Sequence, residues 1–238
     1  FATWVDGMPV NMRSHAHGQG YTDVNFLIPE MVQELEFRKG PYYADVGDFS
    51  SAGSAHFETF SWMPQDVVKL SGGEDGYARG LVAGSAALGT NNLVYAIEAQ
   101  QYDGPWDDID ENLKKYNGML RYVGRGESGH WDVTLMGYDA KWDSADQIPE
   151  RAVREGLISD LGSLDTDVGG KTHRYSLSAR TIRNWSLGQT HASAYVIDYS
   201  LDLWSNFTYF LDDPVNGDEF QQSEDRMIYG GSLAHHWD

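Results

Sequence analysis

Residues 5–60 decide the fold, and they begin Val-Asp-Gly-Met-Pro-Val-Asn at positions 5–11. Asp6-Gly7 follows an apolar residue and is a tight-turn dipeptide, so we expect a strand to end there and the chain to reverse. Pro29-Glu30 suits the first turn of a short helix, because a missing backbone N–H costs nothing at that position. Alternation over 32–37 then predicts another strand. Together these signals predict a small α+β unit.

Five short motifs follow one another through this stretch. They are Val-Asp-Gly-Met-Pro at 5–9, the glycine-rich loop 15–21, Ile-Pro-Glu at 28–30, Lys-Gly-Pro at 39–41 and the Gly/Ser-rich return 47–54. In this order they resemble the second half of the plug domain of TonB-dependent outer-membrane receptors. Each motif is weak alone, but five in sequence are specific to that family.

Composition limits the class of protein. The chain has 238 residues, of which 41% are hydrophobic and 13% aromatic, so it is able to bury a core. No run of about 18 apolar residues predicts a membrane-spanning helix. The absence of cysteine excludes disulfides, thiol catalysis and cysteine-ligated metals. The chain begins at Phe1 without an initiator Met, and we interpret both of its ends as cuts.

From residue 65 onward, apolar residues recur at every second position. This pattern predicts about eight strands, at 65–72, 77–88, 91–102, 112–123, 130–142, 173–183, 190–210 and 226–237. In the longest of them the apolar face consists of Tyr195, Ile197, Tyr199, Leu201 and Leu203. A soluble sandwich and a transmembrane barrel both produce such alternation, with the apolar face toward a core or toward lipid. The alternation alone therefore leaves both open.

After the first hairpin, the connections between these strands alternate in length. Short ones at 89–90, 124–129 and 184–189 alternate with long ones at 102–112, 143–172 and 211–226. Short periplasmic turns and long extracellular loops are typical of outer-membrane barrels. The long connections hold 18 of the 36 acidic residues and 4 of the basic ones, so most of the excess negative charge lies on one rim. A net charge of −19 disfavours nucleic acid as a partner.

Large aromatic residues lie near the ends of the predicted strands. They are Trp131, Trp142, Trp185, Trp204, Tyr209 and Tyr229. Such rings favour the headgroup boundary of a membrane barrel, whereas in a soluble sandwich they would be core or rim residues. A short helix is also predicted at 148–158, because a proline and a glutamate favour its start and Gly156 limits its length.

No group of residues forms an enzyme constellation. Acidic pairs such as Asp107 and Asp108 lack an apolar setting that would raise one carboxyl pKa for acid–base catalysis. His15 and His17, like the pair His235-His236, lack a third ligand at a fixed spacing, and we interpret them as surface pairs. We therefore predict no enzyme activity, no metal site and no cofactor.

The resemblance to TonB-dependent receptors implies a mainly β fold with two parts. Residues 1–62 would be the C-terminal part of a plug, and residues 63–238 the N-terminal part of a plugged antiparallel transmembrane β-barrel, with about 8 of the family's 22 strands. It also implies location in the cell outer membrane, contact with its lipid and energisation by the inner-membrane TonB complex. The implied function is uptake of a small, scarce nutrient such as an iron-siderophore or cobalamin.

Receptors of this family contact the ligand through the plug apices and the inner wall of the barrel. The apices correspond here to 13–21 and 42–48. The side chains predicted to meet a ligand are Arg13, His15, His17, Gln19, Tyr21, Tyr42 and Tyr43. Four of these alternate along 15–21, so in an extended conformation they would share one face. They would equally serve to hold the loops together, and they do not identify the substrate.

Two other classes of protein stay open at this point. A soluble all-β binding or adhesion module would also explain the alternation and the acidic surface. A carbohydrate-active enzyme would explain the abundance of Trp, Tyr and Asp, but it needs two carboxylates at a fixed separation across a cleft.

Overall fold

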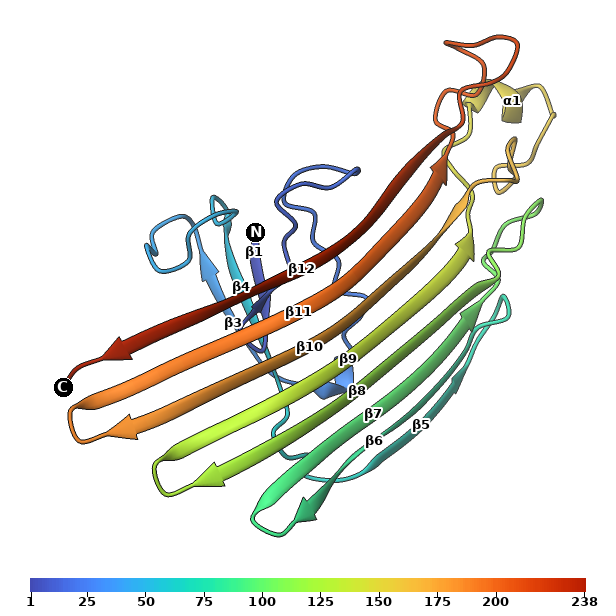
Figure 1. Cartoon of the computed structure of the whole chain (residues 1–238). Helices are drawn as coiled ribbons and strands as arrows, with labels where there is room; N and C mark the ends of the chain where they lie inside the picture. Colours follow the sequence, from blue (N-terminus) through green and yellow to red (C-terminus); the bar gives the residue numbers. More distant parts are fainter.

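The computed structural model describes all 238 residues and contains two β-sheets (Figure 1). The large sheet has eight strands, and each pairs antiparallel with the next one along the chain. In chain order they are β5 (Val67–Gly72), β6 (Ala78–Leu88), β7 (Asn91–Tyr102), β8 (Leu113–Gly126), β9 (Gly129–Asp143), β10 (Gly169–Trp185), β11 (Gly188–Ser205) and β12 (Phe220–His236). All eight strands predicted from the alternation are present, and the mainly β class is confirmed.

The last two strands differ from the prediction at the end where their connection lies. β11 ends at Ser205 rather than at residue 210, because Asn206 turns away and its backbone N–H donates to Asp146 at 2.7 Å. β12 begins at Phe220 rather than at residue 226, since its polar first half still pairs in register with β11. Polar residues therefore hid the start of β12, whereas the aromatic residues after Ser205 made β11 look longer than it is.

The small sheet comes from the first 60 residues. It consists of β2 (Met8–Pro9), β1 (Ala2–Val5), β4 (Gly53–Thr59) and β3 (Val32–Lys39), in that spatial order. β1 and β4 are parallel, and the other pairs are antiparallel. The predicted turn is confirmed, because Asp6 and Gly7 both have positive φ, at 49° and 77°. The predicted short helix is the 3₁₀ turn η1 (Pro29–Met31).

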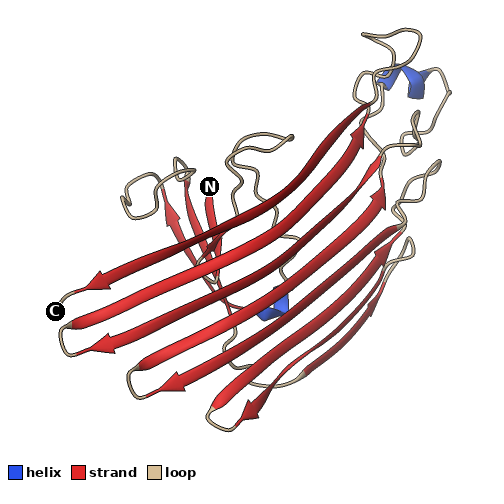
Figure 2. Cartoon of the chain, viewed as in Figure 1, coloured by secondary structure: helices blue, strands red, loops and turns tan.

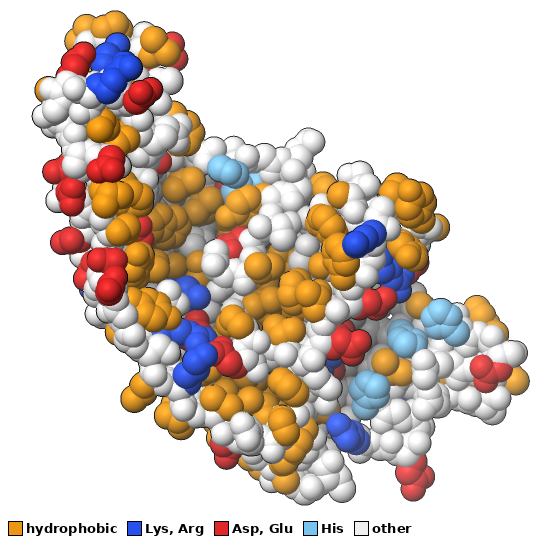
Figure 3. All heavy atoms as spheres, turned by 180° about the vertical axis from the view of Figure 1, so that it is seen from behind, with side chains coloured by type: hydrophobic (Ala, Val, Ile, Leu, Met, Phe, Trp, Pro, Cys, Tyr) orange, Lys and Arg blue, Asp and Glu red, His pale blue; other side chains and the backbone are white.

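The small sheet lies against one face of the large sheet (Figure 2). We call this the inner face; it carries Val94, Ala96 and Glu98 of β7, all of them buried. Apolar side chains of both sheets form one core cluster there. Figure 3 views the molecule from the side of the small sheet, where hydrophobic side chains also lie at the surface. The opposite, outer face leaves its apolar side chains exposed; Ile97 is 69% exposed and Leu135 52%.

β11 presents its apolar residues to the inner face instead of the outer one. Ile197, Tyr199 and Leu201 are buried, and they form a second core cluster with Met8 and Met12 of the N-terminal part. The polar residues that alternate with them consequently lie on the outer face. Periodicity predicted the two faces of this strand correctly, but it gave no signal for which one turns toward the small sheet.

The three long connections lie together at one end of the large sheet, and the short turns lie at the other end (Figure 1). The helix predicted at 148–158 is present as the shorter α1 (Glu150–Arg154), which ends before Gly156 at a φ of 72°. None of the helices has the length and apolar character needed to cross a membrane.

Candidate functional site between the two sheets

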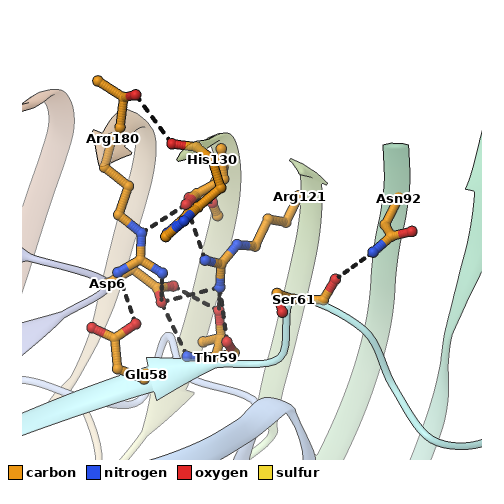
Figure 4. Close-up of polar contacts among 11 residues, drawn as sticks. Asp6, Glu58, Thr59, Ser61, Asn92, Arg121, His130 and Arg180 are labelled. Carbon is orange, nitrogen blue, oxygen red and sulfur yellow. Dashed lines mark hydrogen bonds and ion pairs between the residues drawn. The ribbon is translucent and has the colours of Figure 1, made fainter. Parts of the chain in front are cut away.

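A buried arginine of the large sheet joins the two sheets at the turn after β1 (Figure 4). Nη1 of Arg121 on β8 lies 3.2 Å from Oδ1 of Asp6, and it donates to the carbonyl oxygen and the hydroxyl of Thr59, each at 2.8 Å. The same Asp6 carboxylate accepts the backbone N–H of Thr59 at 3.0 Å. Nη2 of Arg121 lies 3.2 Å from Asp132 on β9. Arg121, Asp6 and Asp132 are all nearly inaccessible to water.

A second arginine joins the same network of ion pairs. Nε of Arg180 on β10 donates to Asp132 at 2.8 Å, its Nη1 to Glu58 at 2.7 Å, and its Nη2 lies 3.3 Å from Asp6. Burial raises the pKa of the Glu58 carboxyl, although the Arg180 charge opposes that shift. Two cations of the large sheet thus hold two acids of the small sheet, with Asp132 orienting both cations.

Glu30 of η1 makes a separate contact with the large sheet. Its two carboxylate oxygens accept from Nη1 and Nη2 of Arg79 on β6, each at 2.7 Å, and Lys69 on β5 donates to it at 2.9 Å. Such a bidentate pair is stronger than a single hydrogen bond. The hydrogen bond from Arg79 lowers the pKa of Glu30 from 4.5 to about 2.

This pKa predicts the effect of acid on the contact between the sheets. The carboxyl pKa of Glu30 is lower in the folded state, so its stabilisation is fully present above pH 4.5 and is lost as the pH falls toward 2. We expect Glu30→Gln to lower the unfolding temperature at neutral pH, and the difference from the unaltered protein to shrink at about pH 3. Calorimetry in detergent at both pH values measures this. A difference independent of pH would show that the charge of Glu30 is irrelevant.

A cavity of about 860 Å³ lies between the N-terminal part and strands β10 to β12. One wall is formed by 9–13 and 46–49, and the other by inner-face residues that include Arg174, Tyr195 and Ile197. Its lining is mixed, with ten hydrophobic residues among nineteen. A volume of this size suits a small molecule.

Three arginines line the cavity. Arg174 is buried and has no carboxylate partner: its guanidinium lies 3.9 Å from the centre of the Phe26 ring, and its Nη1 has no hydrogen-bond partner. Arg13 is exposed and also forms no ion pair in the structure. Arg226, by contrast, pairs with Glu224 and donates to the carbonyl oxygen of Ser14 at 2.5 Å. The cavity therefore has positive charge that the protein itself leaves unbalanced.

Of the seven predicted ligand contacts, Arg13 alone lines this cavity. Tyr42 lies outside the cavity with 84% of its surface exposed. Tyr43 also lies outside it, and its ring packs against the guanidinium of Arg38. Residues 15–21 do not have the extended conformation that would place their side chains on one face; they form two turns around Gly18 and Gly20. The shared face expected for an extended loop is therefore wrong, because both glycines adopt positive φ and reverse the chain.

The turns nevertheless gather three of the aromatic rings in that loop. His15 stacks on Tyr21 with ring centres 3.9 Å apart, and His17 meets the same ring edge-on at 5.9 Å. Nε2 of His15 lies 3.0 Å from the hydroxyl of Tyr199 on β11. Burial lowers the pKa of His15, which favours the neutral ring. Gln19 is exposed and takes no part. The buried His15 thus fastens the loop to the large sheet.

Sequence reasoning missed Arg174, Arg121 and Arg180. Each is a charged residue on a strand face that the structure turns toward the small sheet, and their partners are far away in the sequence. One signal in the sequence could have found such a residue, namely an arginine that shares its strand face with small polar residues. Arg174 is an example, because Thr172 and Ser176 are its neighbours on the same face of β10. The structure contains no group of three or more His, Cys, Asp or Glu side chains placed to hold a metal ion.

The fold that these sites belong to is known from solved structures. No family model and no curated protein matches the chain. The copper transporter OprC superposes on all of it with a TM-score of 0.71 at 19% identity. The ferric-catecholate import receptor Fiu from E. coli K12, in its open form, covers 98% at a TM-score of 0.70 and 14% identity. The siderophore receptor PiuA from Acinetobacter baumannii covers 85% at 0.65 and 13%.

These comparisons show the fold, which the chain shares with part of each of the three proteins. All three are TonB-dependent receptors, and the resemblance inferred from the sequence motifs is therefore confirmed in the structure. The chain spans 35%, 38% and 29% of the lengths of OprC, Fiu and PiuA, respectively.

Proposed function

We propose that the chain is part of an outer-membrane receptor that takes up a scarce nutrient with energy supplied by the inner-membrane TonB complex. In this proposal 1–62 is the distal part of the plug, and 63–238 forms the first eight strands of a barrel with 22 strands in all. The observation that carries it is the fold match over the whole chain, with the small sheet held on the inner face of the strands by buried ion pairs. Lipid would cover the apolar outer face.

The cavity supports a ligand that carries negative charge. Neither Arg13 nor Arg174 has an acidic partner, and Arg174 is buried, where charges are normally paired. A bare metal cation would be repelled by them, whereas an anionic chelate would supply the missing partner. OprC is a copper transporter and Fiu is an import receptor for ferric catecholate. We therefore place the ligand among metals and their chelates.

The rival classes have less support. Asp48 is the one carboxylate among the residues that line the cavity, whereas glycoside hydrolysis ordinarily needs two. A soluble binding module would have to keep residues such as Leu70 and Tyr229, each more than 80% exposed, in water. In the proposed barrel these side chains meet lipid or further strands instead.

The proposed orientation predicts which connections a protease reaches from outside. An endoprotease that cleaves after acidic residues, added to intact cells, should cut the receptor within 103–112, 144–168 and 206–219, where acids are plentiful. It should spare Glu127 in the short turn between β8 and β9, which we place in the periplasm. Mass spectrometry of the fragments measures this.

Permeabilising the outer membrane provides the control for that experiment. Glu127 should then become cleavable, which shows that it is protected by its side of the membrane and not by its conformation. Cleavage at Glu127 in intact cells, with the acidic connections spared, would overturn the orientation.

A further inference from the structure

A second cavity, of about 540 Å³, lies between the two sheets at the end of the large sheet where the short turns are. We call it the short-turn cleft. Its lining is polar, because Val123 is the one hydrophobic residue among thirteen. Arg180 lines this cleft, and on β10 it follows Arg174 of the larger cavity by six positions, or about 20 Å of strand. The two cavities therefore lie at different depths between the sheets.

The two sides of the short-turn cleft carry charges of opposite sign. The large sheet contributes three arginines and one aspartate, which we call the basic wall: Arg121, Arg125, Arg180 and Asp132. The small sheet faces it with two acids and no base, namely Glu34 and Glu58. The formal charges of the two sides cancel when His130, which also lines the cleft, is neutral. In a chain with 36 acidic and 17 basic residues, three arginines beside one acid on a single wall need an explanation.

The large sheet by itself does not satisfy these arginines. Arg121 is only 2% exposed, and its Nε atom has no hydrogen-bond partner. Arg125 is exposed in the cleft and forms no ion pair. Buried charged groups are normally both paired and hydrogen-bonded. The basic wall thus has unused capacity to bind an anion.

Acids of the small sheet supply much of the pairing that the basic wall has. Nη1 of Arg121 lies 3.2 Å from Asp6, and Nη1 of Arg180 lies 2.7 Å from Glu58. Figure 4 shows both guanidinium groups pointing from the large sheet toward these two acids. If the small sheet moves away, both acids leave with it, and Asp132 remains as the one acid for two guanidinium groups. An anion in the cleft would restore the lost pairing.

Small hydroxyl side chains connect the larger cavity with the basic wall. On the inner face of β10, Ser176 and Ser178 occupy the two positions between Arg174 and Arg180. Thr134 on β9 lies directly opposite Ser178. An anion that leaves Arg174 along β10 therefore meets no acid and no large aliphatic side chain before it reaches Arg180.

We propose that the basic wall is a second, transient binding site for the anionic ligand, which reaches it from the larger cavity when the small sheet moves aside. In the docked state Asp6 and Glu58 occupy the arginines and keep this site closed. In the displaced state the ligand replaces the two acids, and Arg125 then draws it toward the short turns. The volume of the cleft suits a small chelate. The inference rests on the proposed function, because it requires an anionic ligand and a small sheet that moves.

Calorimetric titration of the complete receptor in detergent tests for the second site. The probes are two ferric complexes of similar size, a trianionic one with a synthetic hexadentate tris-catecholate and a neutral one with a synthetic hexadentate tris-hydroxamate. The variant Asp6→Asn/Glu58→Gln removes the competing negative charges and keeps the size of both side chains. We expect this variant to bind one more equivalent of the trianionic complex than the unaltered protein does. The neutral complex should bind there at least about tenfold more weakly, because charge-assisted hydrogen bonds are about twice as strong as neutral ones.

Replacing Arg125 by Gln in the same background locates the additional equivalent. Its affinity should fall at least about tenfold, whereas binding in the larger cavity should not change, because Arg125 does not line that cavity. The matched control is Arg183→Gln. Arg183 lies at the same end of the large sheet, but it stacks on Trp185 and does not line the cleft. This control should leave both equivalents unchanged.

Uptake by cells gives a second readout in a receptor whose ion pairs are intact. Arg125→Gln alone should lower the maximal rate of uptake of the trianionic complex, labelled with radioactive iron, several-fold without raising the half-saturating concentration. Arg183→Gln should change neither value. A merely structural role of Arg125 would instead reduce the amount of folded receptor in the outer membrane, which heat-modifiable migration on gels measures.

The outcomes separate this inference from the proposed function. The second site is wrong if Asp6→Asn/Glu58→Gln binds no additional equivalent, if the neutral complex binds there equally well, or if Arg125→Gln behaves like Arg183→Gln. Should the double variant not fold, Glu58→Gln alone is titrated with the same expected results, since it frees Arg180 and leaves Asp6 in place. Failure of the unaltered protein to fractionate with the outer membrane would overturn the proposed function itself.

Discussion

Replacing Arg121 by Met is expected to loosen the small sheet from the large one by about 3 kcal/mol. Removing one partner of a buried ion pair typically costs 3–5 kcal/mol, because the remaining charge is left without compensation. Here Arg180 still reaches Asp6 and Asp132, so the lower end of that range applies. Thr59 also loses the donor to its carbonyl oxygen.

Hydrogen exchange measures this effect where it should occur. Backbone amides of β1 and β4 are expected to exchange roughly a hundredfold faster in Arg121→Met, whereas those of β8 and β9 should change far less. Arg38→Met is the matched control, because Arg38 also pairs with two acids, Glu36 and Asp45, but at the surface. It should leave exchange nearly unchanged. Equal protection of β1 in all three proteins would mean that apolar packing alone holds the sheets together.

In the proposed receptor, the same network would suit a part that moves during transport. Apolar contacts between the sheets are non-directional, whereas the ion pairs of Arg121 and Arg180 fix one orientation of Asp6 and Glu58. A pull that breaks these pairs exposes charges to water that enters between the sheets, which lowers the cost of separation. We therefore infer that the ion pairs make the docked state specific without making it permanent.

Local signals predicted the elements of this fold well. The turn at Asp6-Gly7, the helical turn at Pro29 and all eight strands of the large sheet follow from residue type and period-two alternation. Strand ends were less certain. Polar residues at 220–225 pair with β11 as regularly as the apolar residues after them, so composition gave no sign that β12 had begun.

The site could not be predicted in the same way, because its contacts join residues far apart in the chain. Asp6 meets Arg121 and Arg180, and His15 meets Tyr199. Which face of each strand turns inward decides these contacts, and on β11 the apolar face turned inward while on β10 it stayed outside. The resemblance pointed to the apical loops, and of the residues predicted there Arg13 alone lies in the cavity.

Replacing Arg174 by Met is expected to weaken ligand binding while leaving the protein at least as stable as before. If an anionic group of the ligand pairs with this guanidinium, losing a charge-assisted hydrogen bond costs about 1.5–3 kcal/mol, or roughly 10- to 150-fold in affinity. Stability should not fall. A buried, unpaired cation costs several kcal/mol, more than the roughly 2 kcal/mol that its contact with the Phe26 ring returns.

The expected loss of affinity without a loss of stability distinguishes a ligand-binding role of Arg174 from a structural one. A residue retained for structure loses stability when it is replaced, whereas a residue retained for a ligand loses affinity and often gains stability. Calorimetric titration with a set of ferric chelates, both anionic and neutral, measures affinity, and thermal unfolding of the ligand-free protein measures stability. Met is a suitable replacement because it keeps the unbranched stem of Arg174 beside Met8. A variant that binds the anionic chelates normally but unfolds at a lower temperature would show that Arg174 is retained for its contact with Phe26. The proposal that the ligand is anionic would then lack its main support.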